Sequence, residues 1–173
     1  MSDHFDQAAA RRKLDALLAT STFLKDAWVG AVPDLDVGGL FAFSAMPPSA
    51  GKAGEVLYLI GPELTLTSAQ ATRDFDRLMA RLDVGRVGGD APRLARLVTR
   101  FRNLRRGVIL VRADEHPLIA PGAIAADAFH PPALSVDGAG AHLRFWLFDT
   151  DRLEPSHWTV DVAPDGATRV ASP

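Results

Sequence analysis

The sequence of 173 residues contains no cysteine and no long uninterrupted apolar segment. Without cysteine the chain can form no disulfide, has no thiolate nucleophile and offers no sulfur ligand to zinc. No apolar run approaches the roughly 18 residues that a membrane-spanning helix needs, and residues 1–10 lack the basic start and apolar block of an export signal. These absences predict a cytoplasmic protein with no membrane partner, and no cofactor is indicated.

Motifs for nucleotide binding and for nucleophilic catalysis are missing as well. Gly51-Lys52 lacks the earlier glycine and the following Ser or Thr of a phosphate-binding loop. No Gly-x-Ser-x-Gly sequence marks a nucleophilic serine, and no pair of histidines has the four-residue spacing of a helical metal site. The sequence therefore argues against several common enzyme classes before it favours any function.

What is present predicts a single α+β domain over residues 1–173. A content of 47% hydrophobic and 23% charged residues is enough to bury one core in a chain of this length. Apolar residues alternate over 133–136, 142–148, 157–162 and 168–170, and turn-forming Asp-Gly dipeptides follow the first and third of these runs. We expect these segments to form a C-terminal antiparallel β-meander.

The first two thirds of the chain add helices and further strands to this prediction. The spacing of apolar residues predicts an N-terminal helix over 3–20 and strands over 27–32, 37–45, 55–60 and 64–66. Two tandem central helices are predicted over 67–85 and 90–107, the first from a capping box and the second from a pattern that starts at Asp90. We expect one mainly antiparallel sheet with the helices packed on it.

Positive charge is concentrated in one segment of a chain whose formal net charge is −2. Residues 86–107 contain seven arginines and a single carboxylate, so this segment carries a charge of +6 and the rest of the chain −8. Arg93, Arg96 and Arg100 lie on one flank of the second predicted helix. Three interpretations are open: an ion network with the chain's own acidic segment 149–154, contact with an acidic partner protein or a second copy in a homodimer, and, least favoured, contact with nucleic acid.

Aromatic residues are present on both predicted faces of the strand 142–148. Leu143, Phe145 and Leu147 alternate with Arg144, Trp146 and Phe148, so neither face is fully polar. A sheet covered by helices on one side needs only one apolar face. Trp146 and Phe148 therefore indicate a second covering layer, for which the segment 117–132 is the favoured candidate, or else a dimer contact or a ligand pocket.

Acid–base chemistry is best placed at Asp114, Glu115 and His116, which follow a strand predicted over 108–111, with His130 able to complete the site. Two carboxylates and an imidazole can bind a divalent metal or position a water molecule. Adjacent residues point in different directions, however, so a solvated turn before Pro117 is the competing interpretation. His142 and His157 lie near the starts of two neighbouring predicted strands and could face each other across them, but half-exposed strand-end histidines beside polar neighbours such as Arg144 or Thr159 are the favoured interpretation.

Two functional hypotheses follow from these patterns. The first is a non-catalytic binding module that uses Arg93, Arg96 and Arg100 together with the aromatic face at Trp146 and Phe148. The alternative is a small hydrolase or lyase, metal-dependent or acid–base, at Asp114, Glu115, His116 and His130. No metal is specified by the sequence in either case.

Overall fold

The computed structural model describes residues 5–48, 54–68, 76, 90–101, 107–165 and 167–172. The chain divides into two compact units, residues 1–74 and residues 75–173. That residues 1–173 form a single domain stays a prediction.

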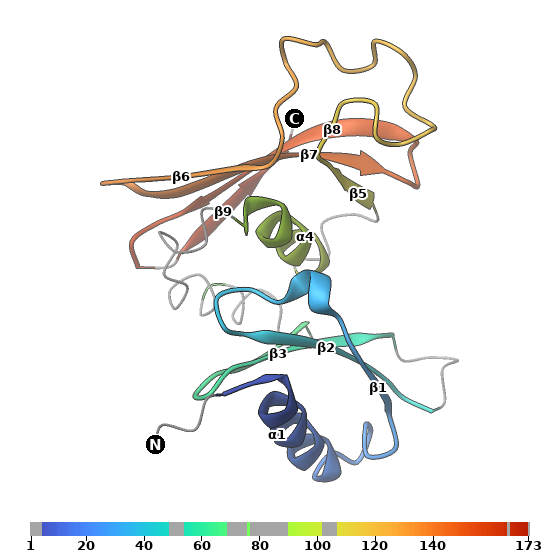
Figure 1. Cartoon of the computed structure of the whole chain (residues 1–173), viewed down its shortest axis with the longest axis vertical. Helices are drawn as coiled ribbons and strands as arrows, with labels where there is room; N and C mark the ends of the chain where they lie inside the picture. The colour runs from blue at the N-terminus through green and yellow to red at the C-terminus, as the bar shows by residue number, and fades with distance from the viewer. Residues whose placement is uncertain are drawn as a thin grey trace. The chain divides into compact units, whose positions relative to one another are not determined.

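Among its described residues, the first unit contains one α-helix, one 3-10 helix and an antiparallel four-stranded sheet (Figure 1). Its elements are α1 (Gln7–Ala19), β1 (Trp28–Ala31), the 3-10 helix η1 (Pro33–Leu35), β2 (Phe41–Met46), β3 (Val56–Ile60) and β4 (Thr65–Thr67). The strand order β1-β2-β3-β4 is the order along the chain. The N-terminal helix and the early strands predicted from the sequence are confirmed.

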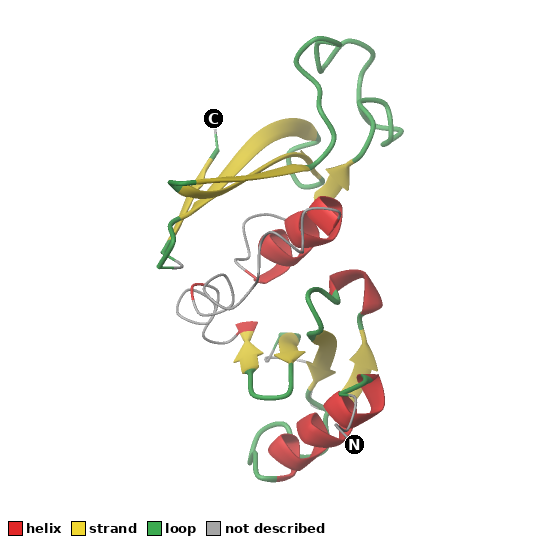
Figure 2. Cartoon of the chain, turned by 60° about the vertical axis from the view of Figure 1, so that its left-hand side comes forward, coloured by secondary structure: helices red, strands yellow, loops and turns green. Residues whose placement is uncertain are grey.

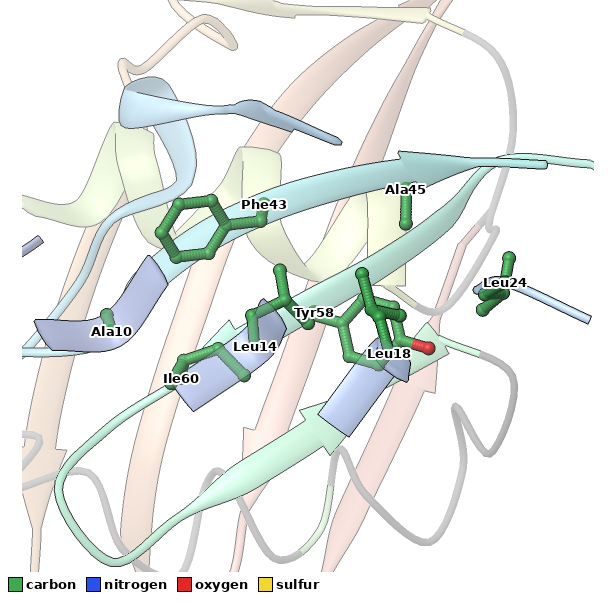
Figure 3. Packing of buried hydrophobic residues seen from close by; sticks show 8 residues of the cluster. All are labelled: Ala10, Leu14, Leu18, Leu24, Phe43, Ala45, Tyr58 and Ile60. Carbon is green, nitrogen blue, oxygen red and sulfur yellow. The ribbon is translucent and has the colours of Figure 1, made fainter. Parts of the chain in front are cut away.

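Helix α1 begins and packs as its sequence directs. The side chain of Asp6 accepts a hydrogen bond of 2.8 Å from the backbone N–H of Ala9, which satisfies a donor that a helix N-terminus otherwise leaves free. The buried residues Leu14 and Leu18 lie on one stripe of the helix. They pack on alternate residues of β2 and β3, including Phe43 and Ile60, as Figure 3 shows. The helix thus covers one face of the sheet.

Among its described residues, the second unit contains helix α4 (Ala91–Phe101) and a five-stranded antiparallel sheet. Its strands are β5 (Gly107–Leu110), β6 (Ala133–Asp137), β7 (Gly140–Asp149), β8 (Glu154–Val162) and β9 (Thr168–Ala171). Strands β6 to β9 pair in sequence order, so the predicted C-terminal meander is confirmed. Helix α4 packs against β5, β6 and β7. Leu143, Phe145 and Leu147, which alternate along β7, are at most 1% exposed.

The tight turn between β6 and β7 depends on a glycine. Gly140 has a φ of +137°, a conformation that residues with a side chain rarely adopt, and a Cβ at this position would collide with the carbonyl oxygen of Val162. Asp137 begins the same turn, and its carboxylate accepts a hydrogen bond of 2.8 Å from the backbone N–H of Ala139. The turn predicted at the Asp137-Gly138 dipeptide is therefore present in the structure.

Strands β5 and β6 pair with different stretches of the same partner, β7. Strand β5 lies opposite residues 146–149, and β6 lies opposite residues 140–144. Leu110 at the end of β5 is opposite Trp146, and Ala133 at the start of β6 is opposite Arg144. The two strands are therefore successive parts of one sheet edge, and residues 111–132 leave that edge and return to it almost where they left. We call this segment the 111–132 excursion; in Figure 2 it is the long loop between β5 and β6.

The predicted architecture differs from the structure in the number of sheets, and one of the two predicted central helices falls largely outside the described residues. The strands form two sheets, one in each unit, and not the single sheet that was expected. Of the two tandem helices, the second is α4, whereas the segment 67–85 falls largely outside the described residues. Within the part of the chain that the structure describes there are two α-helices, α1 and α4, so the tandem arrangement is not confirmed.

Neither of these helices is long and apolar enough to cross a membrane.

Candidate functional site

The 111–132 excursion packs over the aromatic face of the second sheet. Trp146 and Phe148 are two residues apart on β7 and so point to the same face, opposite the face of Phe145. Phe148 is fully buried in a cluster with Leu110 and Ile124, and other apolar residues of the excursion and sheet pack around it, namely Ile119, Phe129 and Trp146. The expected covering layer is therefore present, and this chain supplies it.

Glu115 stabilises the start of the excursion. Its carboxylate accepts hydrogen bonds from the backbone N–H groups of Val111, at 2.6 Å, and Arg112, at 3.3 Å. These bonds satisfy donors that the chain exposes as it leaves β5, which is an ordinary structural use of a carboxylate at a turn. Asp114 beside it is exposed.

His116 packs against the buried aromatic cluster. Its ring stacks on that of Phe148, with centroids 4.2 Å apart and an interplanar angle of 24°. Its Nδ1 atom accepts a hydrogen bond of 3.3 Å from the backbone N–H of Leu118, so in this geometry Nδ1 carries no proton. The imidazole therefore serves as a flat packing surface and as a hydrogen-bond acceptor within the excursion.

His130 joins the far end of the excursion to the sheet through a second histidine. Its Nε2 atom lies 2.9 Å from Nε2 of His157 on β8, and the two rings are perpendicular. The Nδ1 atom of His130 lies 3.0 Å from the carbonyl oxygen of Pro131. A carbonyl oxygen only accepts, so Nδ1 of His130 is the protonated nitrogen of the neutral ring and Nε2 carries the lone pair. The neutral pair then places the shared proton on Nε2 of His157.

The surroundings of His157 favour its neutral form. Burial lowers the pKa of His157 below its usual value, and the neighbouring His130 and Arg144 lower it further. The indole of Trp146, directly opposite His157 in the β7–β8 ladder, lies with its centroid 5.3 Å from the imidazole. The indole N–H of Trp146 is buried and has no hydrogen-bond partner in the described part of the molecule.

The four residues predicted for acid–base chemistry are thus used separately. Glu115 caps a turn, His116 stacks on Phe148, and His130 bonds to His157, a residue that was not assigned to this site. Within residues 5–48, 54–68, 76, 90–101, 107–165 and 167–172, no group of three or more His, Asp or Glu side chains converges on a point where a metal could sit. The catalytic roles themselves stay untested.

His142 and His157 do not face each other, so the less favoured of the two interpretations of these histidines is not what the structure shows. In the register of β7 and β8, His142 lies opposite Asp161 and His157 lies opposite Trp146. The turn between β7 and β8 fixes this register. Asp149 pairs with Glu154, so the residues three positions further from the turn on each strand, Trp146 and His157, also pair. This signal was available in the sequence, whereas the path that brings His130 to His157 was not.

His142 forms a separate polar cluster between two carboxylates. Its Nδ1 atom is 2.8 Å from Asp161 and its Nε2 atom is 3.5 Å from Asp137. The hydrogen bond to Asp161, followed by that to Asp137, raises the pKa of His142. Asp161, Arg169 and the turn residues beside them line a shallow cleft of about 310 Å³ together with His142. Both ring nitrogens face carboxylates, an arrangement that stabilises imidazolium and leaves no free base for catalysis.

The arginines of α4 lie opposite its apolar side. Leu94, Leu97, Val98 and Phe101 are at most 1% exposed. Among the arginines, Arg100 is exposed, Arg96 is half-buried, and the side chain of Arg93 is 40% exposed at 3.9 Å from Asp90. We call Arg93, Arg96 and Arg100 the arginine flank. Arg102, Arg105 and Arg106 fall outside the described residues.

The acidic segment 149–154 has local hydrogen bonds and an ion pair of its own. The carboxylate of Asp149 accepts hydrogen bonds from the backbone N–H groups of Asp151, at 2.9 Å, and Arg152, at 3.0 Å. Arg152 in turn lies 3.7 Å from Glu154. Neutralisation of the arginine flank by this segment stays a prediction.

Comparison with protein-family models, with curated proteins and with solved structures finds no match to this chain. Its function is therefore argued from its own residues.

Proposed function

We propose that this chain is a non-catalytic cytoplasmic binding module whose arginine flank contacts an acidic protein surface, either on a partner or on a second copy of the chain. The observation that carries the proposal is the division of α4 into a buried apolar side and a flank of three guanidinium groups at helical spacing. Guanidinium groups form bidentate hydrogen bonds with carboxylates, and a row of them on a rigid helix presents several such groups together.

The aromatic face contributes less to this proposal than the arginine flank does. Phe148 is fully buried beneath the 111–132 excursion, and Trp146 is half-buried beside it. A partner would have to displace Ile124 and its neighbours to reach either ring. Arg93 and Arg100 reach solvent, so contact with the arginine flank does not disturb this apolar cluster.

The catalytic alternative, a hydrolase or lyase at Asp114, Glu115, His116 and His130, receives less support. The carboxylate of Glu115 is already used by two backbone N–H groups, and His116 is packed on Phe148. A general base must lie within hydrogen-bond reach of the proton it removes, together with groups that position the substrate. Glu115, His116 and His130 are each engaged in the fold of the excursion, and Asp114 is exposed.

The test replaces the arginine flank with alanine, in the variant R93A/R96A/R100A, and measures binding to poly-L-glutamate by fluorescence anisotropy at several salt concentrations. Self-association is followed by analytical ultracentrifugation under the same conditions. We expect the wild-type chain to bind and the affinity to fall with salt, because the attraction is between exposed charges. The triple variant should bind at least about 10-fold more weakly, equivalent to about 1.4 kcal/mol.

The control removes three positive charges elsewhere, at exposed positions of both units, in the variant R12A/K25A/R169A. Circular dichroism establishes that both variants are folded. Equal affinity of the two triple variants would contradict the proposal, because only net charge would then matter. Tighter binding to a duplex DNA oligonucleotide than to poly-L-glutamate, lost in R93A/R96A/R100A, would assign the surface to nucleic acid instead.

A further inference from the structure

The contact between His130 and His157 differs from an ordinary hydrogen bond between polar side chains. Both atoms involved are ring nitrogens, and each neutral imidazole has one nitrogen lone pair to offer. The two nitrogens come from separate elements, the end of the 111–132 excursion and the middle of β8. In the neutral pair the Nε2 proton of His157 lies between them. When His157 instead carries its proton on Nδ1, both Nε2 lone pairs face the same position, and one cation can accept both of them.

The hydrogen bond of His130 to its own backbone prepares this ring for such a role. Donation from Nδ1 to the carbonyl oxygen of Pro131, at 3.0 Å, holds the ring in place and leaves the lone pair on Nε2. Histidines that bind metals in proteins usually donate their second N–H to a carbonyl or carboxylate in this way.

The separation of the two nitrogens matches the requirement of a metal ion. Two nitrogen ligands with bonds of about 2.0–2.1 Å, at angles between about 90° and 109°, lie about 2.9–3.4 Å apart. The observed separation of 2.9 Å falls within this range. We propose that His130 and His157 together bind one divalent transition-metal ion, of the kind that prefers imidazole nitrogen, through their Nε2 atoms.

The metal class follows from the ligands. Imidazole suits Zn²⁺, Ni²⁺ and Cu²⁺, whereas Mg²⁺ and Ca²⁺ require oxygen ligands. No third His, Asp or Glu of the described residues joins the pair, so water or a donor from another molecule fills the remaining coordination positions. Binding would fasten the excursion to β8, because each element supplies one ligand. Arg144 is exposed on the same face, and solvent screens its repulsion of the cation.

The experiment uses the full chain, stripped with EDTA, and titrates it with Zn²⁺ in a calorimeter. We expect one Zn²⁺ per chain and no heat of binding with Mg²⁺. The variants H130A and H157Q should each lower the Zn²⁺ affinity at least 10-fold. The matched control is H142A, which removes a histidine held between two carboxylates on the neighbouring strand and should leave the affinity unchanged.

A second readout reports on the excursion itself. Arg112 is exposed near the start of the excursion and offers a trypsin site. Zn²⁺ should slow cleavage after Arg112 in the wild-type chain and in H142A, and have no effect in H130A or H157Q. The variant R93A/R96A/R100A should still bind Zn²⁺, so a failure of the proposed binding function leaves this result unaffected. Equal Zn²⁺ affinity of the wild type and H130A/H157Q, or no Zn²⁺ binding by the wild type at 100-fold molar excess, would overturn the assignment.

Discussion

Two tryptophans of neighbouring strands differ in how their indole N–H groups are used. Trp158, on β8, donates from Nε1 to the hydroxyl of Ser156 at 2.8 Å. The N–H of Trp146, on β7, is buried without a partner among the described residues. A buried donor that lacks a partner lowers the stability of the native state by about 1–3 kcal/mol, whereas a satisfied one contributes about 0.5–1.5 kcal/mol.

This difference predicts unequal results for the same substitution. W158F should lower the free energy of unfolding by about 1 kcal/mol more than W146F, because only W158F breaks a hydrogen bond while W146F removes an unsatisfied donor. Urea denaturation of both variants measures the difference. Equal or reversed costs would mean that the N–H of Trp146 has an acceptor.

His142 predicts a pH-dependent contribution to stability. The carboxylates of Asp161 and Asp137 raise the pKa of His142 above its usual value, so the folded state binds the proton more tightly than the unfolded state. The resulting stabilisation is fully present below about pH 6.5 and is lost as the pH rises through the raised pKa. The backbone N–H of Ala139, and then His142, lower the pKa of Asp137, whose contribution is lost only as the pH falls through that lowered value.

The measurement compares the urea midpoints of the wild type and H142Q at pH 5.5 and pH 8.5. The advantage of the wild type should be larger at pH 5.5. H116Q, in a histidine that stacks on Phe148 and has no carboxylate partner in the described structure, serves as the control and should not reproduce this pattern. An advantage that is independent of pH would show that the Asp137–His142–Asp161 cluster forms no charged interaction in solution.

The 111–132 excursion is held to the sheet by few buried side chains. Ile124 is 7% exposed, whereas Leu118 of the same segment is 58% exposed. The hydrogen bonds within the excursion are those of isolated turns, such as Ala128 to Ala125, and contribute little against the entropy of ordering the chain. Its order therefore depends on packing against Leu110 and Phe148 more than on its own backbone.

We predict that I124A loosens the excursion with little effect on the strands. Replacing a buried isoleucine with alanine lowers the free energy of unfolding by about 2–5 kcal/mol. The excursion should be destabilised most, because Ile124 packs the excursion against the sheet. Amide hydrogen exchange should accelerate at Ala128 and Phe129, while amides in the centre of β7 and β8 keep their protection. L118A provides the control and should change neither set. Uniform acceleration across β7 and β8 would show that excursion and sheet unfold together.

At the scale of the whole chain, the sequence predicted elements better than it predicted their assembly. The alternation of Leu143, Phe145 and Leu147 identified β7 and its buried face, because a strand's period of two is a local property. The same alternation does not say which strands share a sheet. Strands that were expected to join into one sheet therefore belong to two.

The candidate site shows the same limit at the level of single residues. Trp146 and Phe148 predicted a covering layer, because two large aromatic side chains on the second face of a strand require one. Nothing local indicated that Glu115 would bond to the backbone of Val111, or that the excursion would bring His130 to His157, 27 residues further along the chain. Such contacts depend on the path of a long irregular segment, for which no periodic pattern exists.

Strands β5 and β6 end and begin at nearby positions on β7, and this determines which changes the connection between them can tolerate. Leu110 pairs with Trp146 and Ala133 pairs with Arg144, and these two partners are only two residues apart on β7. The pairing along this edge of β7 is therefore nearly complete without residues 111–132. Insertions at exposed positions of the excursion, such as Leu118, would leave the frame of the meander intact and keep Phe148 covered by Ile124. A foreign peptide inserted there would be displayed on a scaffold that already holds both ends of the excursion.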